Sequence, residues 1–187
     1  MAALRLNKSI TLIELLITIV LFSIIVLSFS SIDLFSRRQL LNLERQSTLQ
    51  NELSILIAHM SKNIQKATGT FVDFPININA AAPGGPLMTI YLDSNGDGLR
   101  DKQVAYRWDN LNYQVKYYDN YGSSPGSLEV IANKIRSFTM SLPNGSKSHY
   151  VELNAIACWQ PGQPVSYYTN PCNKILTRVT MHSVSLN

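Results

Sequence analysis

An apolar segment near the N-terminus constrains the fold of this chain more than any other feature. From Ile10 to Ile32 the residues are apolar or carry a hydroxyl group, and Glu14 is the single charge. At about 1.5 Å per residue this segment makes a helix of roughly 35 Å, enough to cross the hydrocarbon core of a bilayer. Arg5 and Lys8 precede it without an acid. The positive-inside rule therefore predicts a cytoplasmic N-terminus and an exported remainder.

Glu14 is the unusual residue of the segment. An ionised carboxylate one turn into a membrane is unfavourable by several kcal/mol unless it is paired. The helix itself offers no cation, and Arg5 and Lys8 lie on the basic leader. A new α-amino group at Ile10, presented by a neighbouring molecule, would be a cation at the right depth.

The string I-T-L-I-E-L-L after a short basic leader resembles the prepilin processing motif of type IV pilins and pseudopilins. The resemblance implies that a prepilin peptidase cuts between Ser9 and Ile10 and methylates the new amine of Ile10. It also implies that Glu14, the fifth mature residue, neutralises the N-terminus of a neighbouring subunit during assembly. The chain departs from the family in having Ser9 where glycine is preferred and Ile10 where phenylalanine or methionine is common.

Two other interpretations of the segment exist. In an ordinary single-pass anchor, Glu14 would snorkel to the interface. A cleaved secretory signal peptide is disfavoured, because the apolar run is too long and lacks a small-residue cleavage site at its far end.

The pilin resemblance further implies binding partners and a cellular location. The partners are other pilins or pseudopilins, the prepilin peptidase and inner-membrane lipid; the location is the bacterial inner membrane, with the C-terminal part periplasmic or extracellular, and then the pilus or pseudopilus.

The helical pattern continues beyond the membrane segment. Neither proline nor glycine occurs between Ile10 and Thr68, and Gly69 is a natural C-cap. We expect one helix from about 10 to 67, with a membrane and assembly part over 10–32 and an exported amphipathic part over 33–67. Its stripe should dock on the chain's own domain, since too few heptads repeat for a coiled coil. The stripe consists of Leu49, Leu53, Leu56, Ile57, Met60 and Ile64.

From 68 to 187 the pattern changes to short alternating runs with turns between them, which predicts one antiparallel sheet domain. With leader 1–9 and the long helix in front, the expected fold class is α+β and pilin-like. A loop is expected over 80–86 and a tight turn at Asp109-Asn110. The expected strands are 71–75, 87–92, 104–108, 113–117, 138–142, 149–157 and 175–186, the last with a bulge near His182.

The net charge and the cysteine content limit which classes of partner, and which cellular compartment, the sequence predicts. Removing Arg5 and Lys8 leaves 14 of the 16 cations against 12 acids, so the net charge falls from +4 to +2. That charge is too small and dispersed to predict a nucleic-acid partner.

Cys158 and Cys172 are the only cysteines, and in an oxidising compartment an isolated pair predicts one disulfide. Closing a loop of about 15 residues would stabilise the fold by roughly 3 kcal/mol. Two free buried thiols are the alternative, disfavoured by the polar, turn-rich sequence between them.

The segment D-S-N-G-D-G-L-R-D has oxygen donors at calcium-loop spacing, with Gly98 at the sixth place. The place of the twelfth-position acid is taken by Val104, and no helices flank the segment. A glycine-rich hairpin loop is the alternative. The expected calcium ligands are Asp93, Asn95, Asp97, the Leu99 carbonyl and Asp101.

No catalytic motif is recognisable in the sequence. Hydrolase, zinc-protease and phosphate-loop signatures do not occur, and His59, His149 and His182 stand without acids or thiols at ligand spacing. We therefore expect structural or exposed histidines and no enzyme.

The order of features after the helix resembles W-type minor pilins and J-type type II secretion pseudopilins. The residues that carry this resemblance are the Ala-Thr end of the helix, Y-R-W-x-N, V-I-A-N-K-I-R-S-F and a terminal strand. It implies a minor subunit that helps to prime or cap a type IV pilus or a secretion pseudopilus. The alternative is a membrane-tethered binding module, an adhesin or DNA-uptake pseudopilin that recognises a ligand through its sheet domain.

Overall fold

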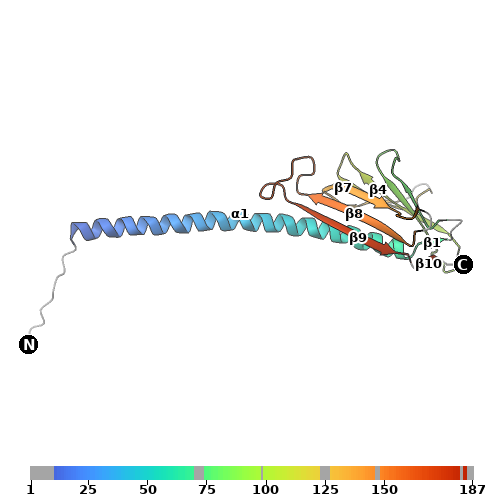
Figure 1. The fold of residues 1–187 in the computed structure, drawn as a ribbon, viewed down its shortest axis with the longest axis horizontal. Coiled ribbons are helices and arrows are strands. Elements are labelled where there is room, and N and C mark those ends of the chain that lie inside the picture. Colours follow the sequence, from blue (N-terminus) through green and yellow to red (C-terminus); the bar gives the residue numbers. More distant parts are fainter. Residues whose placement is uncertain are drawn as a thin grey trace, which may run out of the picture. The chain divides into compact units, whose positions relative to one another are not determined.

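A computed structural model describes residues 11–69, 74–97, 99–122, 127–145, 148–181 and 183–184. The chain divides into two compact units, Met1–Leu41 and Asn42–Asn187, and the boundary falls inside the helix α1 (Leu12–Gln65) (Figure 1). The helix expected over 10–67 is thus observed to within two residues of both limits, although residue 10 itself lies outside the described residues.

Five hydroxyl groups in the first unit are satisfied inside α1. Each of the five donates to a backbone carbonyl three or four residues earlier, a bond that occupies the hydroxyl and leaves the helix unbroken. The pairs are Thr18 with Leu15, Ser23 with Ile19, Ser28 with Ile24, Ser30 with Val26 and Ser31 with Leu27, at 2.8–2.9 Å.

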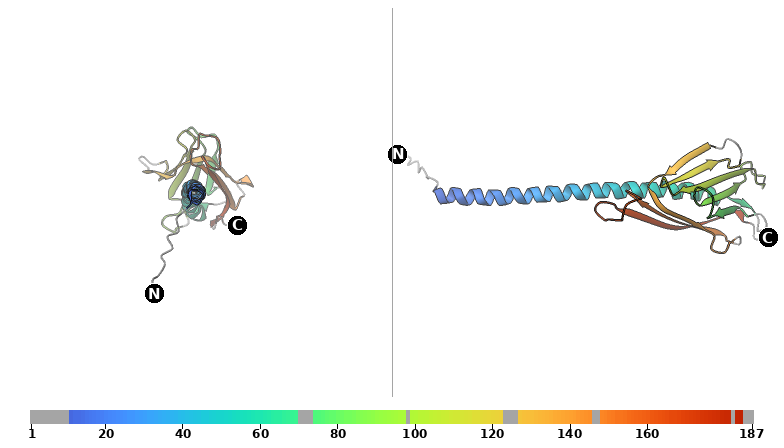
Figure 2. Two further views of the ribbon diagram at one scale, coloured as in Figure 1. Left: turned by 90° about the vertical axis from the view of Figure 1, so that its left-hand side faces the viewer. Right: turned by 90° about the horizontal axis from the view of Figure 1, so that it is seen from above.

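The second unit contains two antiparallel sheets and one short parallel pair (Figures 1 and 2). The five-stranded sheet has the order β2-β3-β4-β5-β6 and the three-stranded sheet the order β7-β8-β9. In the first sheet the strands are β2 (Ile76–Asn79), β3 (Leu87–Leu92), β4 (Lys102–Asp109), β5 (Gln114–Asp119) and β6 (Ser127–Ala132). The remaining strands are β7 (Ile135–Ser141), β8 (Tyr150–Cys158), β9 (Cys172–Thr180) and the parallel pair β1 (Thr68–Gly69) and β10 (Ser183–Val184).

The sequence-based strand assignment is right for most of the alternating runs and differs from the structure at several other places. One sheet was expected and two are observed, β6 was not predicted, and Tyr113 lies in a turn with a φ of 55° instead of in a strand. The expected strand 175–186 ends at Thr180, and the chain then pairs with β1; its bulge residue, His182, lies outside the described residues. Of the expected strand 71–75, residues 71–73 are not described, while Phe74 and Pro75 precede the observed strand β2.

The core of the second unit forms where α1 meets the two sheets. Leu49, Leu53, Leu56, Met60 and Ile64 of the predicted stripe are fully buried, and Ile57 packs against them. They join one cluster with side chains from both sheets. The stripe therefore docks on the chain's own domain, and fully burying each such side chain contributes roughly 1.5–3 kcal/mol.

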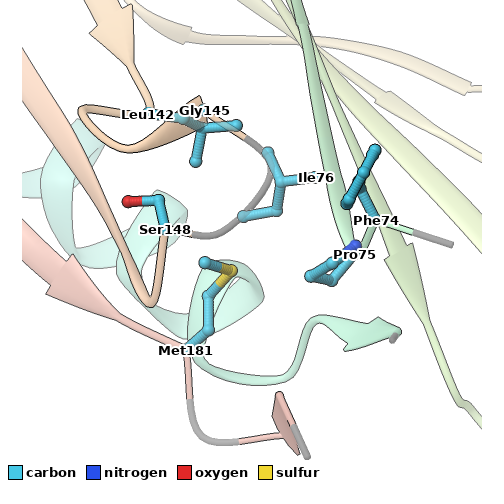
Figure 3. A pocket seen from close by; sticks show the side chains of 7 residues that line it. All are labelled: Phe74, Pro75, Ile76, Leu142, Gly145, Ser148 and Met181. Atoms are coloured by element: carbon cyan, nitrogen blue, oxygen red, sulfur yellow. The ribbon is translucent and has the colours of Figure 1, made fainter. Parts of the chain in front are cut away.

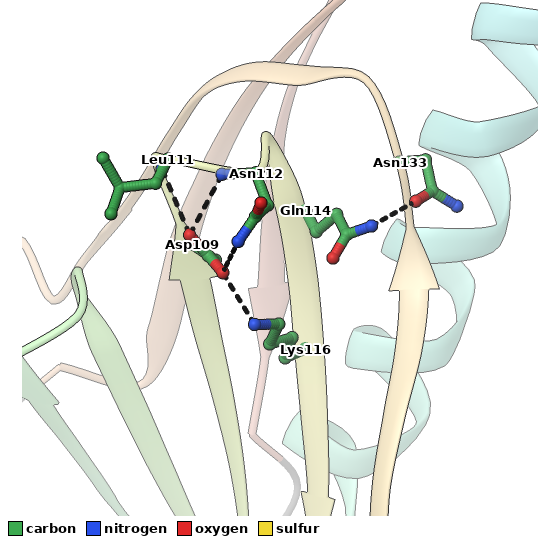
Figure 4. Close-up of polar contacts among 6 residues, drawn as sticks. All are labelled: Asp109, Leu111, Asn112, Gln114, Lys116 and Asn133. Atoms are coloured by element: carbon green, nitrogen blue, oxygen red, sulfur yellow. Dashed lines mark hydrogen bonds and ion pairs between the residues drawn. The ribbon is translucent and has the colours of Figure 1, made fainter.

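The turn between β4 and β5 is organised by Asp109 (Figure 4). Its Oδ1 accepts hydrogen bonds from the backbone N–H groups of Leu111 and Asn112, both at 3.1 Å. Its Oδ2 accepts from Asn112 Nδ2 at 2.8 Å and from Lys116 Nζ at 2.6 Å. These bonds hold the pKa of Asp109 well below its ordinary value. The chain turns near the predicted place, but over the four residues 110–113 after Asp109 and not at Asp109-Asn110, and side-chain bonds of Asp109 hold this turn.

Candidate functional site

The first turn of α1 places Glu14 in a capping box with Thr11. The backbone N–H and the hydroxyl of Thr11 both donate to Glu14 Oε2, at 2.9 and 3.0 Å, and the backbone N–H of Glu14 donates to Thr11 Oγ1 at 3.3 Å. This is the reciprocal T-x-x-E arrangement of helix N-termini. The sequence-based prediction considered only cations as partners of Glu14, and it overlooked the capping signature that gives Glu14 these hydrogen bonds.

The capping box leaves the charge of Glu14 without a counter-charge among the described residues of the first unit. The nearest basic side chain there is Arg37, which pairs with Asp33 at 2.9 Å on the following part of α1. Ser9 and Ile10, where the resemblance places cleavage and methylation, lie outside the described residues.

The first unit presents apolar side chains around the whole circumference of α1. Every residue from 11 to 38 is exposed, and none of the most apolar 18-residue window is buried. By length and composition the helix could cross a membrane once. A helix that is apolar on all sides requires an apolar surrounding, either lipid or other protein.

The two cysteines are joined in a disulfide, as predicted. Cys158 at the end of β8 and Cys172 at the start of β9 are bonded, with their Cα atoms 4.1 Å apart. Asn170, only 2 % exposed, fixes the enclosed loop: its Nδ2 donates to the carbonyls of Gln160, Gln163 and Pro164, and its Oδ1 accepts from the Gln160 N–H. The sequence did not identify Asn170.

The tip of this loop displays two aromatic rings. Tyr167 and Tyr168 are exposed and contact each other edge to face, with ring centroids 5.0 Å apart. Arg45 of α1 donates to the Thr169 carbonyl at 3.3 Å, so the loop is tied to the helix within the second unit.

The predicted calcium residues form a loop that satisfies its own backbone. Asp93 Oδ1 accepts from the N–H groups of Asn95 and Gly96, and Asp97 Oδ1 accepts from Leu99 N–H. The carboxylate of Asp101 accepts from the hydroxyl and the N–H of Ser94, and these bonds lower its pKa.

A converged set of calcium ligands is not visible in this loop. In the part of the chain that the structure describes, no group of three or more acidic, histidine or cysteine side chains could hold a metal ion, and Gly98 lies outside that part. Calcium binding here stays a prediction.

His59 is not isolated, as the sequence suggested, but lies in a polar cluster between α1 and the five-stranded sheet. The hydroxyl of Tyr106 lies 2.8 Å from His59 Nδ1 and accepts from Asn63 Nδ2 at 2.6 Å. The rings of His59 and Tyr117 meet edge to face, with centroids 4.8 Å apart. Partial burial lowers the pKa of His59, and burial raises the pKa of Tyr117 to about 12. This arrangement agrees with a structural role for His59.

Comparison with protein-family models, curated proteins and solved structures gives no match. Function must therefore be argued from the residues and their geometry.

The cavities of the second unit differ in size and lining. One of about 10 Å³ lies between Ile76 of β2, Ser148 and Met181 (Figure 3), and it has room for no more than about one water molecule. A larger hollow of about 400 Å³ lies at the ends of β3, β4 and β5. Its lining includes Lys102, whose Nζ pairs with Asp119 Oδ1 at 2.6 Å.

Proposed function

We propose that this chain is a minor pilin or pseudopilin, a structural subunit that helps to prime or cap a type IV pilus or a type II secretion pseudopilus. The observation that carries the proposal is the change along α1. Residues 11–38 are exposed and largely apolar, whereas Leu49 to Ile64 bury one face in the chain's own core. The first part requires lipid before assembly and neighbouring helices after it.

Glu14 has the role of the assembly residue in this proposal. Thr11 donates to Oε2, so Oε1 can accept from the ammonium group of a neighbour's Ile10 without opening the capping box. Joining two subunits in this way compensates a charge that is costly in an apolar surrounding. A misaligned neighbour would leave both charges unpaired, and the pair therefore sets the register between subunits.

Processing provides the first test. In a host with an active prepilin peptidase, intact-mass analysis of the membrane-purified protein should find a chain that starts at Ile10 and carries one added methyl group. Recovery of chains that begin only at Met1 would contradict the proposal.

The assembly role of Glu14 is tested by two substitutions at the capping box. Glu14→Gln keeps the box, since glutamine also serves at this position, but removes the charge. Thr11→Ala breaks the box but keeps the carboxylate. We expect Glu14→Gln to reach normal membrane abundance and to lose co-assembly with partner subunits, while Thr11→Ala still co-assembles. Unchanged assembly of Glu14→Gln would mean that Glu14 merely snorkels.

A membrane-tethered binding module is the second candidate, and the ordered disulfide loop with Tyr167 and Tyr168 at its tip favours it. Paired exposed tyrosines on a rigid loop are typical of recognition surfaces. A deletion strain separates the two functions. Loss of fibres or of secretion supports the structural subunit, and intact fibres with lost adhesion or DNA uptake support the binding module.

A further inference from the structure

The strand β6 forms one edge of the five-stranded sheet (Figure 2, right-hand view, yellow-orange). Its inner side pairs with β5, from Tyr118 opposite Leu128 to Val115 opposite Ala132. On its outer side no strand pairs with it in the described part of the chain. An edge strand presents alternate N–H and C=O groups that another extended chain can bind.

The other edge strands of the two antiparallel sheets carry polar or basic side chains on their exposed positions. On β2 these are Asn77 and Asn79, and on β7 they are Thr139 and Ser141. On β9, Leu176 is exposed, but Lys174 and Arg178 flank it on the same face. Lysine and other charged residues on an edge oppose pairing with a further strand.

β6 has no charged residue on the face that carries Leu128 and Val130. Its sequence S-L-E-V-I-A contains neither a basic residue nor a proline. Leu128 and Val130 are 56 % and 41 % exposed and alternate along the strand, so they point to the same face of the sheet. Leu128 lies opposite Tyr118, which packs on the small apolar cluster of Ala82, Leu87 and Ala105. The exposed aliphatic surface of β6 therefore continues onto Tyr118 of β5 at Leu128, whereas Val130 lies opposite Lys116 of β5.

The opposite face of β6 carries a single charge, Glu129. It lies opposite Tyr117, where its negative charge adds to the effect of burial in raising the pKa of Tyr117, and it opposes the lowering of the pKa of His59 by burial. Within the described residues, no basic side chain forms a salt bridge with Glu129. A strand added to β6 would place one of its own residues directly opposite Glu129.

We propose that β6 binds an extended segment of another protein as an additional strand, and that this segment has an aliphatic–basic–aliphatic pattern. The basic residue would pair with Glu129, and the two aliphatic residues would extend the surface of Leu128 and Val130. A second copy of β6 is disfavoured in the register that would align the aliphatic residues of both strands. Antiparallel pairing that places Leu128 against Val130 also places Glu129 opposite Glu129, and like charges opposite each other are destabilising.

The proposal is tested with a labelled, end-capped peptide Thr-Thr-Val-Lys-Val-Thr-Thr and the full-length protein in detergent, by fluorescence anisotropy. Two peptides serve as controls: one with glutamate in place of lysine, and one with the same side chains but N-methylated backbone amides, which cannot form a strand ladder. We expect the lysine peptide to bind about fivefold more tightly than the glutamate peptide and the N-methylated peptide not to bind.

Protein variants locate the binding to the edge. Val130→Lys should abolish binding of the lysine peptide, and Glu129→Gln should remove its advantage over the glutamate peptide. Leu176→Lys, the matched change on β9, should bind normally. Circular dichroism and thermal melting check that each variant is folded.

Four results would overturn the proposal. These are binding by none of the peptides, binding of the N-methylated peptide, unaltered binding by folded Val130→Lys, and a concentration-dependent dimer of the free protein that Val130→Lys abolishes. The last would show that a second copy occupies the edge.

Discussion

Several carboxylates of this chain are held by groups within a few residues in the sequence. Glu14 bonds to Thr11, Asp109 to Asn112 and Asp93 to Gly96. Such local motifs can be recognised in a sequence, because Asp, Asn, Ser and Thr at short spacing compete for nearby backbone N–H groups. The cluster around His59 could not be recognised, since its partner Tyr106 lies 47 residues away.

Asp109 gives a prediction with a defined pH dependence. Asp109→Asn loses the bond from Lys116 and weakens those from Asn112, and should lower the free energy of unfolding by about 1–3 kcal/mol at pH 7. Because folding depresses the pKa of Asp109, the stabilisation is present above about pH 4 and is lost as the pH falls further. Chemical denaturation of wild type and variant at several pH values measures the difference.

Asp33→Asn is the matched control for Asp109→Asn. Asp33 forms an exposed pair with Arg37, so its substitution should change the free energy of unfolding by less than about 0.5 kcal/mol. A similar loss in both variants would contradict the structural role given to Asp109.

The environment of His59 predicts a second pH dependence of the stability, at higher pH than that of Asp109. Its pKa lies below the ordinary value because burial disfavours the imidazolium, Lys62 acts in the same direction, and Glu129 opposes both. The unfolded chain therefore binds a proton more readily, and stability should fall as the pH decreases below about 6.5. His59→Gln should flatten the stability–pH curve between pH 7.5 and about 5. An unchanged slope would show that other groups dominate this range.

At the scale of secondary-structure elements, the alternating runs identify most strands because one face of each is buried. The strand β6 escaped prediction because residues 127–130 are exposed on both faces, so alternation there carries no burial signal. Division into two sheets depends on which strands pair, and this information is not local in the sequence. The same holds for β10, which pairs with β1 more than a hundred residues before it.

The loop before β3 depends on Gly85, whose φ is +111°. A Cβ atom there would lie 1.9 Å from the Trp108 carbonyl oxygen, which is backbone and cannot rotate away. Gly96 also has a positive φ, +83°, but open space around it. We expect Gly96→Ala to lower the free energy of unfolding by about 1–2 kcal/mol through φ strain alone, and Gly85→Ala to lower it clearly more. Equal effects in thermal denaturation would argue against the close approach.

The disulfide links the end of β8 to the start of β9. Replacing Cys158 and Cys172 by serine should lower the free energy of unfolding by roughly 2–4 kcal/mol, because the unfolded chain regains the freedom of the closed loop. Asn170 should still organise the loop, and Asn170→Ala in the intact disulfide protein tests this separately. Limited proteolysis between Cys158 and Cys172, compared between wild type and variants, reports the order of the loop.

At the scale of the whole chain, the two units differ in whether their apolar side chains are buried in the structure or exposed. Leu53→Ala removes a fully buried side chain of the second unit and should lower the free energy of unfolding by about 2–5 kcal/mol. Leu21→Ala changes an exposed residue of the first unit and should have an effect within about 0.5 kcal/mol. Denaturant titration in detergent, followed by tryptophan fluorescence, measures both. A large effect of Leu21→Ala would show that the first unit shares the core.

The long apolar helix, its buried stripe, the sheet domain and the disulfide were all predictable from periodicity and composition. Cleavage at Ser9 and Ile10, the assembly role of Glu14 and calcium binding stay predictions. They concern a processing enzyme, neighbouring subunits and an ion, none of which a single chain contains.

The hydroxyl bonds inside α1 bear on how this helix moves between surroundings. The hydroxyl protons of Thr18 and of the serines at 23, 28, 30 and 31 are already bonded to carbonyls of their own helix. Leaving lipid for contact with another helix therefore breaks no hydrogen bond and requires no new one. For these five residues the preference between the two states then depends on shape and dispersion, with the small serine side chains permitting close approach of a neighbouring backbone. The hydroxyl groups of α1 are therefore satisfied equally well in lipid and in contact with other helices.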